Sequence, residues 1–113
     1  MTTPRKILFV CARNKIRSLT AEKLLAHSCL YAVRSRGVSK EARVRIKRED
    51  IGWADVIFVM EKNHKDRLVE EFRDELSGKE VICLFIEDIY EPMEDALIEE
   101  LDAKLSAHGI VIG

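Results

Sequence analysis

The stretch that decides the fold is the turn at residues 11–18, which reads Cys11-Ala12-Arg13-Asn14-Lys15-Ile16-Arg17-Ser18. Residues 6–10, which are apolar from Ile7 onward, precede this turn and are typical of a short buried strand. After the turn, apolar residues recur at helical spacing through residues 18–28. We therefore predict a strand, a tight polar turn and a helix, which together form the first part of a βαβ unit.

The rest of the chain continues this alternation. A basic stretch at residues 39–48 indicates a loop or a short helix, and residues 110–113 are ambiguous. Further strands are predicted at residues 30–35, 55–60 and 81–86, and further helices at residues 61–76 and 94–105. The pattern predicts one α/β domain over residues 1–113, a small doubly wound four-stranded parallel sheet flanked by helices. In such folds ligands bind at the carboxyl ends of strands, so we expect a phosphate-binding loop after the first strand.

Composition narrows the class of protein. With 47% hydrophobic and 35% charged residues, the chain has an ordinary soluble profile. Its longest apolar runs are too short to span a bilayer, so we expect a cytoplasmic protein with no membrane partner. The cysteines, Cys11, Cys29 and Cys83, form no C-x-x-C pair, which argues against a disulfide framework or a zinc site. We expect Cys29 and Cys83 to be core or near-core thiols.

Charge is distributed unevenly along the chain. Residues 1–48 hold 13 Lys and Arg against two Asp and Glu, whereas residues 49–113 hold six against 18. The asymmetry indicates either an anionic partner for the first half or two differently charged solvated faces. The basic stretch contains no interleaved aromatic residues, so a nucleic-acid partner is not expected.

The residue types in the turn favour phosphate chemistry. Unpaired backbone N–H groups at a helix start bind phosphate, and Arg17 adds a planar two-point fork for phosphoryl oxygens. The same surroundings stabilise a thiolate, so Cys11 at the base of the turn suggests nucleophilic phosphoryl transfer. The structural alternative is that Cys11 is merely a small apolar residue at the end of a core strand.

These residues also carry a family resemblance. The turn resembles the C-x-G-N-x-C-R-S-P-x-A-E loop of low-molecular-weight protein tyrosine phosphatases, through Cys11, Asn14, Arg17, Ser18, Ala21 and Glu22. Arg13, Ile16 and Leu19 depart from that pattern. Residues 35–38 resemble the family's S-A-G-T turn, residues 55–64 its third strand with the M-[D/E]-x-x-N run, and residues 88–90 its D-P-Y motif. The chain looks like a compact bacterial branch of the family, the predicted tyrosine phosphatases.

The resemblance implies roles for individual residues. Asp88 follows the fourth predicted strand, so it can reach the same sheet edge and act as a general acid; the alternative is a solvated acid among Glu87, Glu91 and Glu94. His64 is expected at a helix start or on the surface. The catalytic residues would be Cys11, Arg17 and Asp88, and the substrate-binding residues Ala12, Arg13, Asn14, Lys15, Ile16, Ser18 and Tyr90, the last as a wall of the pocket. No metal and no cofactor is implied.

The function expected from these features is hydrolysis of phosphomonoesters, of the phosphotyrosine type, through a phosphocysteine intermediate. Its partners would be a phosphorylated protein or small molecule, with phosphate or another oxyanion as ligand. Three alternatives stay open: an arsenate reductase, a phosphocysteine carrier of the kind used in sugar transport, and a non-hydrolytic module that binds phosphate or phosphoprotein. Arsenate reduction needs a mobile resolving thiol, and neither Cys29 nor Cys83 is expected to supply one.

Overall fold

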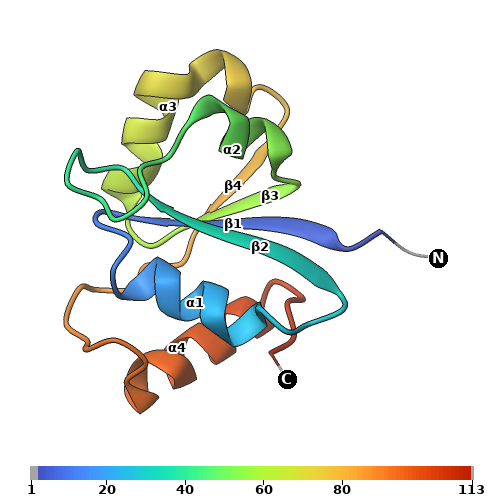
Figure 1. Ribbon diagram of the computed structural model, residues 1–113, viewed down its shortest axis with the longest axis vertical. Helices are drawn as coiled ribbons and strands as arrows, with labels where there is room; N and C mark the ends of the chain where they lie inside the picture. The colour runs from blue at the N-terminus through green and yellow to red at the C-terminus, as the bar shows by residue number, and fades with distance from the viewer. Residues whose placement is uncertain (1–2, 113) are drawn as a thin grey trace.

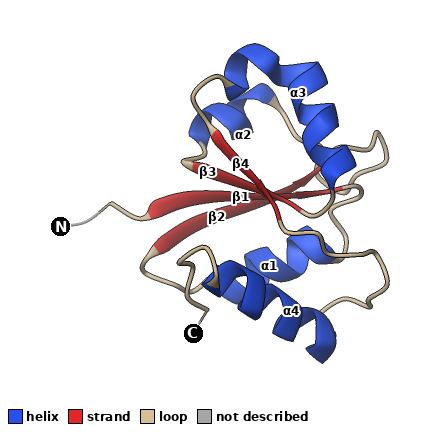
Figure 2. Cartoon of the chain, turned by 180° about the vertical axis from the view of Figure 1, so that it is seen from behind, coloured by secondary structure: helices blue, strands red, loops and turns tan. Residues whose placement is uncertain are grey.

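The structure, a computed structural model, describes residues 3–112. Four parallel strands form one sheet in the order β2-β1-β3-β4. Helices α1 and α4 cover one face of the sheet, and helices α2 and α3 cover the other (Figures 1 and 2). The predicted fold class is thereby confirmed. The strands are β1 (Arg5–Cys11), β2 (Tyr31–Gly37), β3 (Val56–Val59) and β4 (Glu80–Cys83), and the helices are α1 (Arg17–Leu25), α2 (Arg48–Trp53), α3 (Lys62–Leu76) and α4 (Asp95–Ser106).

Strand β1 lies inside the sheet and has a core on each face. Ile7 and Phe9 are fully buried in the apolar cluster that includes α1 and α4, whereas Leu8 and Val10 are fully buried in the cluster of α2 and α3. A strand covered on both faces needs apolar side chains in both directions. This is why its sequence is an unbroken apolar run instead of an alternating one.

The site position follows from the connections. The chain leaves β1 through α1 on one face of the sheet and leaves β3 through α3 on the other (Figure 1). The adjacent carboxyl ends of β1 and β3 are therefore the topological switch point at which such folds bind ligands. Cys11 ends β1, and Glu61 follows β3 by two residues, so both lie at this edge.

Strand β4 and helix α1 are shorter than predicted. β4 ends at Cys83 instead of residue 86, because Phe85 has a left-handed φ of 54° that interrupts the regular ladder. Pairing nevertheless resumes beyond it, where the N–H of Ile86 donates to the carbonyl of Met60 (2.8 Å). Helix α1 ends at Leu25, three residues before the predicted end.

Helix α2 was not predicted. The basic stretch at residues 39–48 is largely a loop, and the short helix begins at its end, where the Asp50 carboxylate accepts a hydrogen bond from the backbone N–H of Lys47 (3.0 Å). Residues 110–112 form no helix or strand, and Gly113 lies outside the described residues. Between residues 3 and 112, no helix has the length and apolar composition required to cross a membrane.

Candidate active site

Cys11 lies at the end of β1 with its side chain only 3% exposed. The Oγ of Ser18 lies 2.9 Å from its sulfur, and the backbone N–H of Asn14 donates to the sulfur over 3.3 Å. Helix α1 starts at Arg17, within the last residues of the turn, so the unpaired N–H groups of the helix start lie at the turn. Hydrogen-bond donors therefore surround the position where negative charge on sulfur or on a bound oxyanion would lie.

The backbone of the turn is held in an unusual conformation at Asn14. Its φ is 59°, in the left-handed region that asparagine tolerates better than most residues. The Asn14 side-chain amide donates to Ser18 Oγ (2.9 Å), which leaves the Ser18 hydroxyl proton free to point at the sulfur of Cys11. Arg13, at the family's glycine position, is not among the residues with positive φ, so the turn does not require glycine there.

A second loop supports the turn from outside. A side chain at Gly37 would place its Cβ 2.6 Å from the carbonyl oxygen of Ala12 and 2.5 Å from the Cβ of Ala42, so only glycine allows this approach. Three backbone N–H groups of the loop donate to carbonyls of the turn, namely Val38 to Cys11 (3.0 Å), Ser39 to Ala12 (2.9 Å) and Arg43 to Arg13 (2.9 Å). The turn is thus fixed by backbone hydrogen bonds as well as by its own side chains.

Arg17 is buried and firmly oriented. Its side chain is 3% exposed, and Nη1 donates both to Glu61 Oε2 (2.6 Å) and to the carbonyl oxygen of Ile86 (2.7 Å). Nε lies 3.8 Å from Asp88 Oδ1, a long contact at the cavity. The two hydrogen bonds occupy Nη1, so Nε and Nη2 are the nitrogens left to form a two-point fork for a phosphoryl group.

Glu61 is a site residue that the sequence interpretation missed. The signal was available, because Glu61 closely follows β3, and the carboxyl ends of β1 and β3 are neighbours. The same reasoning that selected Asp88 after β4 would have selected it.

His64 supports Glu61 from the first turn of α3. Its Nδ1 accepts a hydrogen bond from the backbone N–H of Glu61 (3.1 Å), and its Nε2 lies 3.7 Å from Glu61 Oε2. Burial, followed by repulsion from Arg17, lowers the pKa of His64 to about 4, so the ring is neutral near pH 7. The prediction of a helix-start position is confirmed, whereas a surface position is wrong, because His64 is only 2% exposed.

A cavity of about 330 Å³ opens above the turn. Asp88, whose side chain is 64% exposed, lies on the wall of this cavity. Asn14 and Ser18 are fully buried beside the sulfur and form the support of the turn. The cavity is lined by Cys11, Ala12, Arg13, Lys15, Ile16, Arg17 and Asp88.

Tyr90 is not brought to this cavity. Its hydroxyl donates to Glu100 on α4, and its ring packs against the core cluster on that side of the sheet. The interpretation of Tyr90 as a wall of the pocket therefore needs correction. The position of Tyr90 in the sequence does not indicate that its hydroxyl will donate a hydrogen bond to a residue of α4.

The other cysteines are not placed to react with Cys11. Cys29 is exposed, which corrects its predicted core position, and it follows the end of α1 that is remote from the turn. Cys83 is partly buried and packs with the α2 and α3 cluster, whereas Cys11 belongs to the cluster on the opposite face. Neither thiol is thus positioned to form a disulfide with Cys11.

The fold is shared with low-molecular-weight protein tyrosine phosphatases, which agrees with the resemblance indicated by the motifs; one of them, from Streptococcus pyogenes, is 18% identical, with a TM-score of 0.65 and coverage of 85% of this chain and 82% of the other. Comparison with curated proteins finds a protein-arginine-phosphatase of Geobacillus stearothermophilus, 34% identical over 93 residues. That alignment covers 61% of this chain and 63% of the relative, so the chain matches less than two thirds of the relative's length.

Solved structures match over nearly the whole chain. The YwlE arginine phosphatase from Geobacillus stearothermophilus is 27% identical, with a TM-score of 0.64 and coverage of 93% of this chain and 95% of the other. Vibrio vulnificus Wzb, solved in complex with benzylphosphonate, is 21% identical, with a TM-score of 0.71 and coverage of 94% and 97%. No family model matches the chain.

Proposed function

We propose that this chain is a phosphatase that hydrolyses phosphomonoesters of the phosphotyrosine type through a phosphocysteine intermediate. The observation that carries the proposal is the placement of Cys11 in the turn at the base of a cavity that Arg17 and Asp88 also line. Two similar proteins are arginine phosphatases, and Wzb was solved with benzylphosphonate bound. Both observations support a site for phosphoryl groups in this chain. The cytoplasmic location expected from the sequence belongs to the same proposal.

In the first step the Cys11 thiolate attacks phosphorus, an S–P bond forms and the ester P–O bond breaks. Arg17, through Nε and Nη2, and the backbone N–H groups of residues 12–17 hold the equatorial oxygens, where charge is spread in the transition state. Asp88, in its protonated form, gives its proton to the leaving oxygen. The hydrogen bond from Ser18 stabilises the sulfur when it leaves in the second step.

In the second step Asp88, now a carboxylate, takes a proton from a water molecule. The water oxygen attacks phosphorus, the S–P bond breaks and inorganic phosphate is released, which restores the Cys11 thiolate. Asp88 is exposed and close to Arg17, so it can reach both the leaving group and water. The residues of the chain suffice for both steps, and the proposal includes no metal or cofactor.

Arsenate reduction is not favoured, because Cys29 and Cys83 lie away from the Cys11 sulfur. A non-hydrolytic binding module would retain the turn and Arg17 but would have no use for Asp88 at the cavity. The test is hydrolysis of para-nitrophenyl phosphate, phosphotyrosine and phosphoarginine peptides by the wild type and Cys11→Ser. We expect turnover of the aryl esters that is lost in Cys11→Ser, while phosphate binding persists; equal turnover by both proteins would refute the proposal.

A further inference from the structure

The rim of the cavity carries cations that form no ion pair with a carboxylate of the described residues. Arg13 and Lys15 line the cavity and are exposed, and Arg43 is fixed beside them because its Nε donates to the carbonyl oxygen of Asn14 (3.1 Å). Within residues 3–112, no carboxylate oxygen lies within 4.0 Å of a charged side-chain nitrogen of any of these three residues. Glu41 lies nearby and accepts a hydrogen bond from Ser39 (2.6 Å), which lowers the pKa of the Glu41 carboxyl together with a smaller contribution from the positive charge of Arg13.

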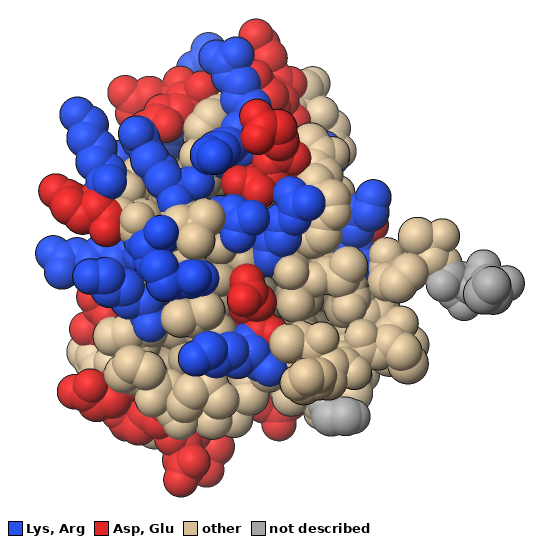
Figure 3. Space-filling view, viewed as in Figure 1, with Lys and Arg blue, Asp and Glu red and all other residues tan. Residues whose placement is uncertain are grey.

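The other arginines of the basic first half are used differently. Arg34 and Arg36 both pair with the buried Asp50, while Arg45 pairs with Glu71 and Arg48 with Glu75. Figure 3 shows Lys and Arg side chains gathered over the end of the molecule where the turn and residues 38–47 lie in Figure 1. Arg34, Arg36, Arg45 and Arg48 are thus neutralised by acidic partners. The positive charge at the cavity mouth is left available for a ligand.

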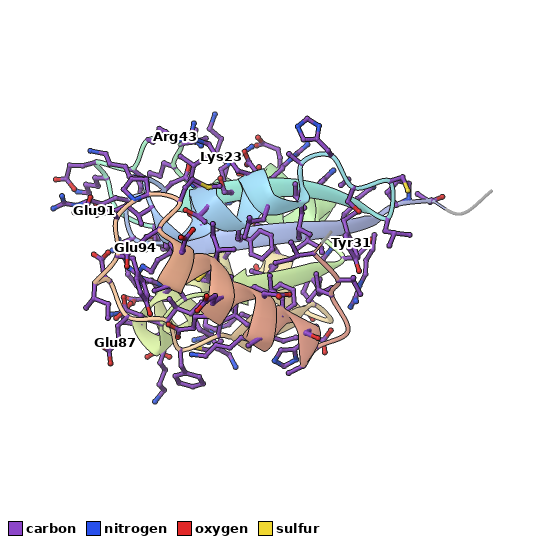
Figure 4. All side chains as sticks on the ribbon, turned by 90° about the horizontal axis from the view of Figure 1, so that it is seen from below. Lys23, Tyr31, Arg43, Glu87, Glu91 and Glu94 are labelled. Carbon is purple, nitrogen blue, oxygen red and sulfur yellow. The ribbon has the colours of Figure 1, made fainter. Side chains whose placement is uncertain are left out.

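The opposite side of the mouth is acidic. Residues 87–94, which lead from β4 to α4, place Asp88 on the cavity wall and carry further carboxylates. In Figure 4, Glu91, Glu94 and Glu87 lie at the same end of the molecule as Arg43 and below it, with Glu87 farthest from Arg43. A ligand that enters the cavity therefore meets positive charge on one side and negative charge on the other.

We propose that the substrate is a phosphorylated protein segment with an acidic side chain on one side, and one side only, of the phosphorylated residue. Arg13, Lys15 and Arg43 would bind that second anionic group while the phosphoryl group occupies the turn. The cations extend from the cavity rim onto the neighbouring loop, where Lys40 is also exposed, which suits an extended chain better than a compact small molecule. The acidic side of the mouth opposes a uniformly anionic ligand such as nucleic acid. This inference rests on the proposed function and specifies its substrate class.

The test uses three phosphotyrosine peptides of equal length, with glutamates before, after or on neither side of the phosphotyrosine. Binding is measured with Cys11→Ser at low ionic strength, so the result does not depend on turnover. We expect one glutamate-bearing peptide to bind about fivefold more tightly than the neutral peptide. Its advantage should fall about twofold for each of Arg13→Gln and Lys15→Gln, and should shrink as salt rises.

Arg73→Gln is the matched control, because Arg73 is an exposed arginine in the last turn of α3, towards the amino end of β4 and away from the cavity. It should leave the peptide preference unchanged. Equal binding of all three peptides, or a preference that survives the Arg13→Gln/Lys15→Gln double variant, would overturn the inference. Failure of the wild type to hydrolyse para-nitrophenyl phosphate would instead overturn the proposed function, so the two failures are distinguishable.

Discussion

Removing the Glu61 carboxylate tests whether Arg17 is held ready to bind a phosphoryl group. Glu61 Oε2 accepts a 2.6 Å hydrogen bond from a guanidinium that is 3% exposed. A hydrogen bond to a charged group is worth about 1.5–3 kcal/mol. The lower value applies here, because the Glu61 side chain is 38% exposed and water can replace its carboxylate as the partner of Arg17. A loss of about 1.5 kcal/mol corresponds to a roughly tenfold lower kcat/KM for Glu61→Ala. Glu61→Gln should lose less, because its amide oxygen can still accept the hydrogen bond.

The assay is a double-mutant cycle on para-nitrophenyl phosphate hydrolysis, with wild type, Glu61→Ala, Arg17→Lys and the double variant. If Glu61 acts through Arg17, the double variant should be scarcely worse than Arg17→Lys alone. Substitutions at Glu61 keep its backbone N–H, which donates a hydrogen bond to His64. Thermal unfolding of each variant checks separately that the protein remains folded. Additive losses in the cycle, or an unchanged kcat/KM for Glu61→Ala, would refute this positioning role.

Three further predictions concern other parts of the site. Arg17→Lys should lose much of its activity despite keeping its charge, because lysine cannot form the planar fork; unchanged kinetics would exclude Arg17 as the phosphoryl ligand. Asp88→Asn should lose about 10²–10⁴-fold on phosphotyrosine but less on para-nitrophenyl phosphate, whose leaving group departs without a proton; an equal loss across substituted phenyl phosphates would contradict a general-acid role. Burial lowers the pKa of His64 from 6.5 to about 4, so between pH 4 and 6.5 the unfolded chain binds more protons at this residue than the folded chain does. The free energy of unfolding should therefore fall by up to about 3 kcal/mol as the pH drops from 6.5 to 4. Denaturant unfolding of wild type and His64→Gln measures this, and identical pH dependence in both would exclude His64 as the cause.

The fold and the base of the site were predictable because they depend on local patterns. The apolar run before Cys11 and the helical spacing after Ser18 determine a strand, a turn and a helix in sequence order. Parallel topology then brings the carboxyl ends of strands to one edge, which is why the turn and Asp88 line the same cavity although they lie far apart in the chain.

What could not be predicted depends on contacts between elements. The sequence around Tyr90 does not reveal that Glu100 will accept its hydroxyl hydrogen bond, because that pairing follows from how α4 packs on the sheet. The burial of His64 likewise depends on the packing of α3 beside Arg17. The early end of β4 is set by the left-handed backbone of Phe85, a conformation that an aromatic residue rarely adopts and that no local pattern indicates.

The most direct test of the central proposal is to trap the phosphoenzyme on Cys11. Wild-type protein is mixed with para-nitrophenyl phosphate, quenched within milliseconds and analysed by intact-protein mass spectrometry, with Cys11→Ala as the control that has no nucleophile. We expect one added phosphoryl group on the wild type, located at Cys11 by peptide mapping, more of it in Asp88→Asn if hydrolysis of the intermediate is slowed, and none in Cys11→Ala. Steady hydrolysis without a phosphorylated intermediate, or a phosphoryl group on another residue, would contradict nucleophilic catalysis by Cys11.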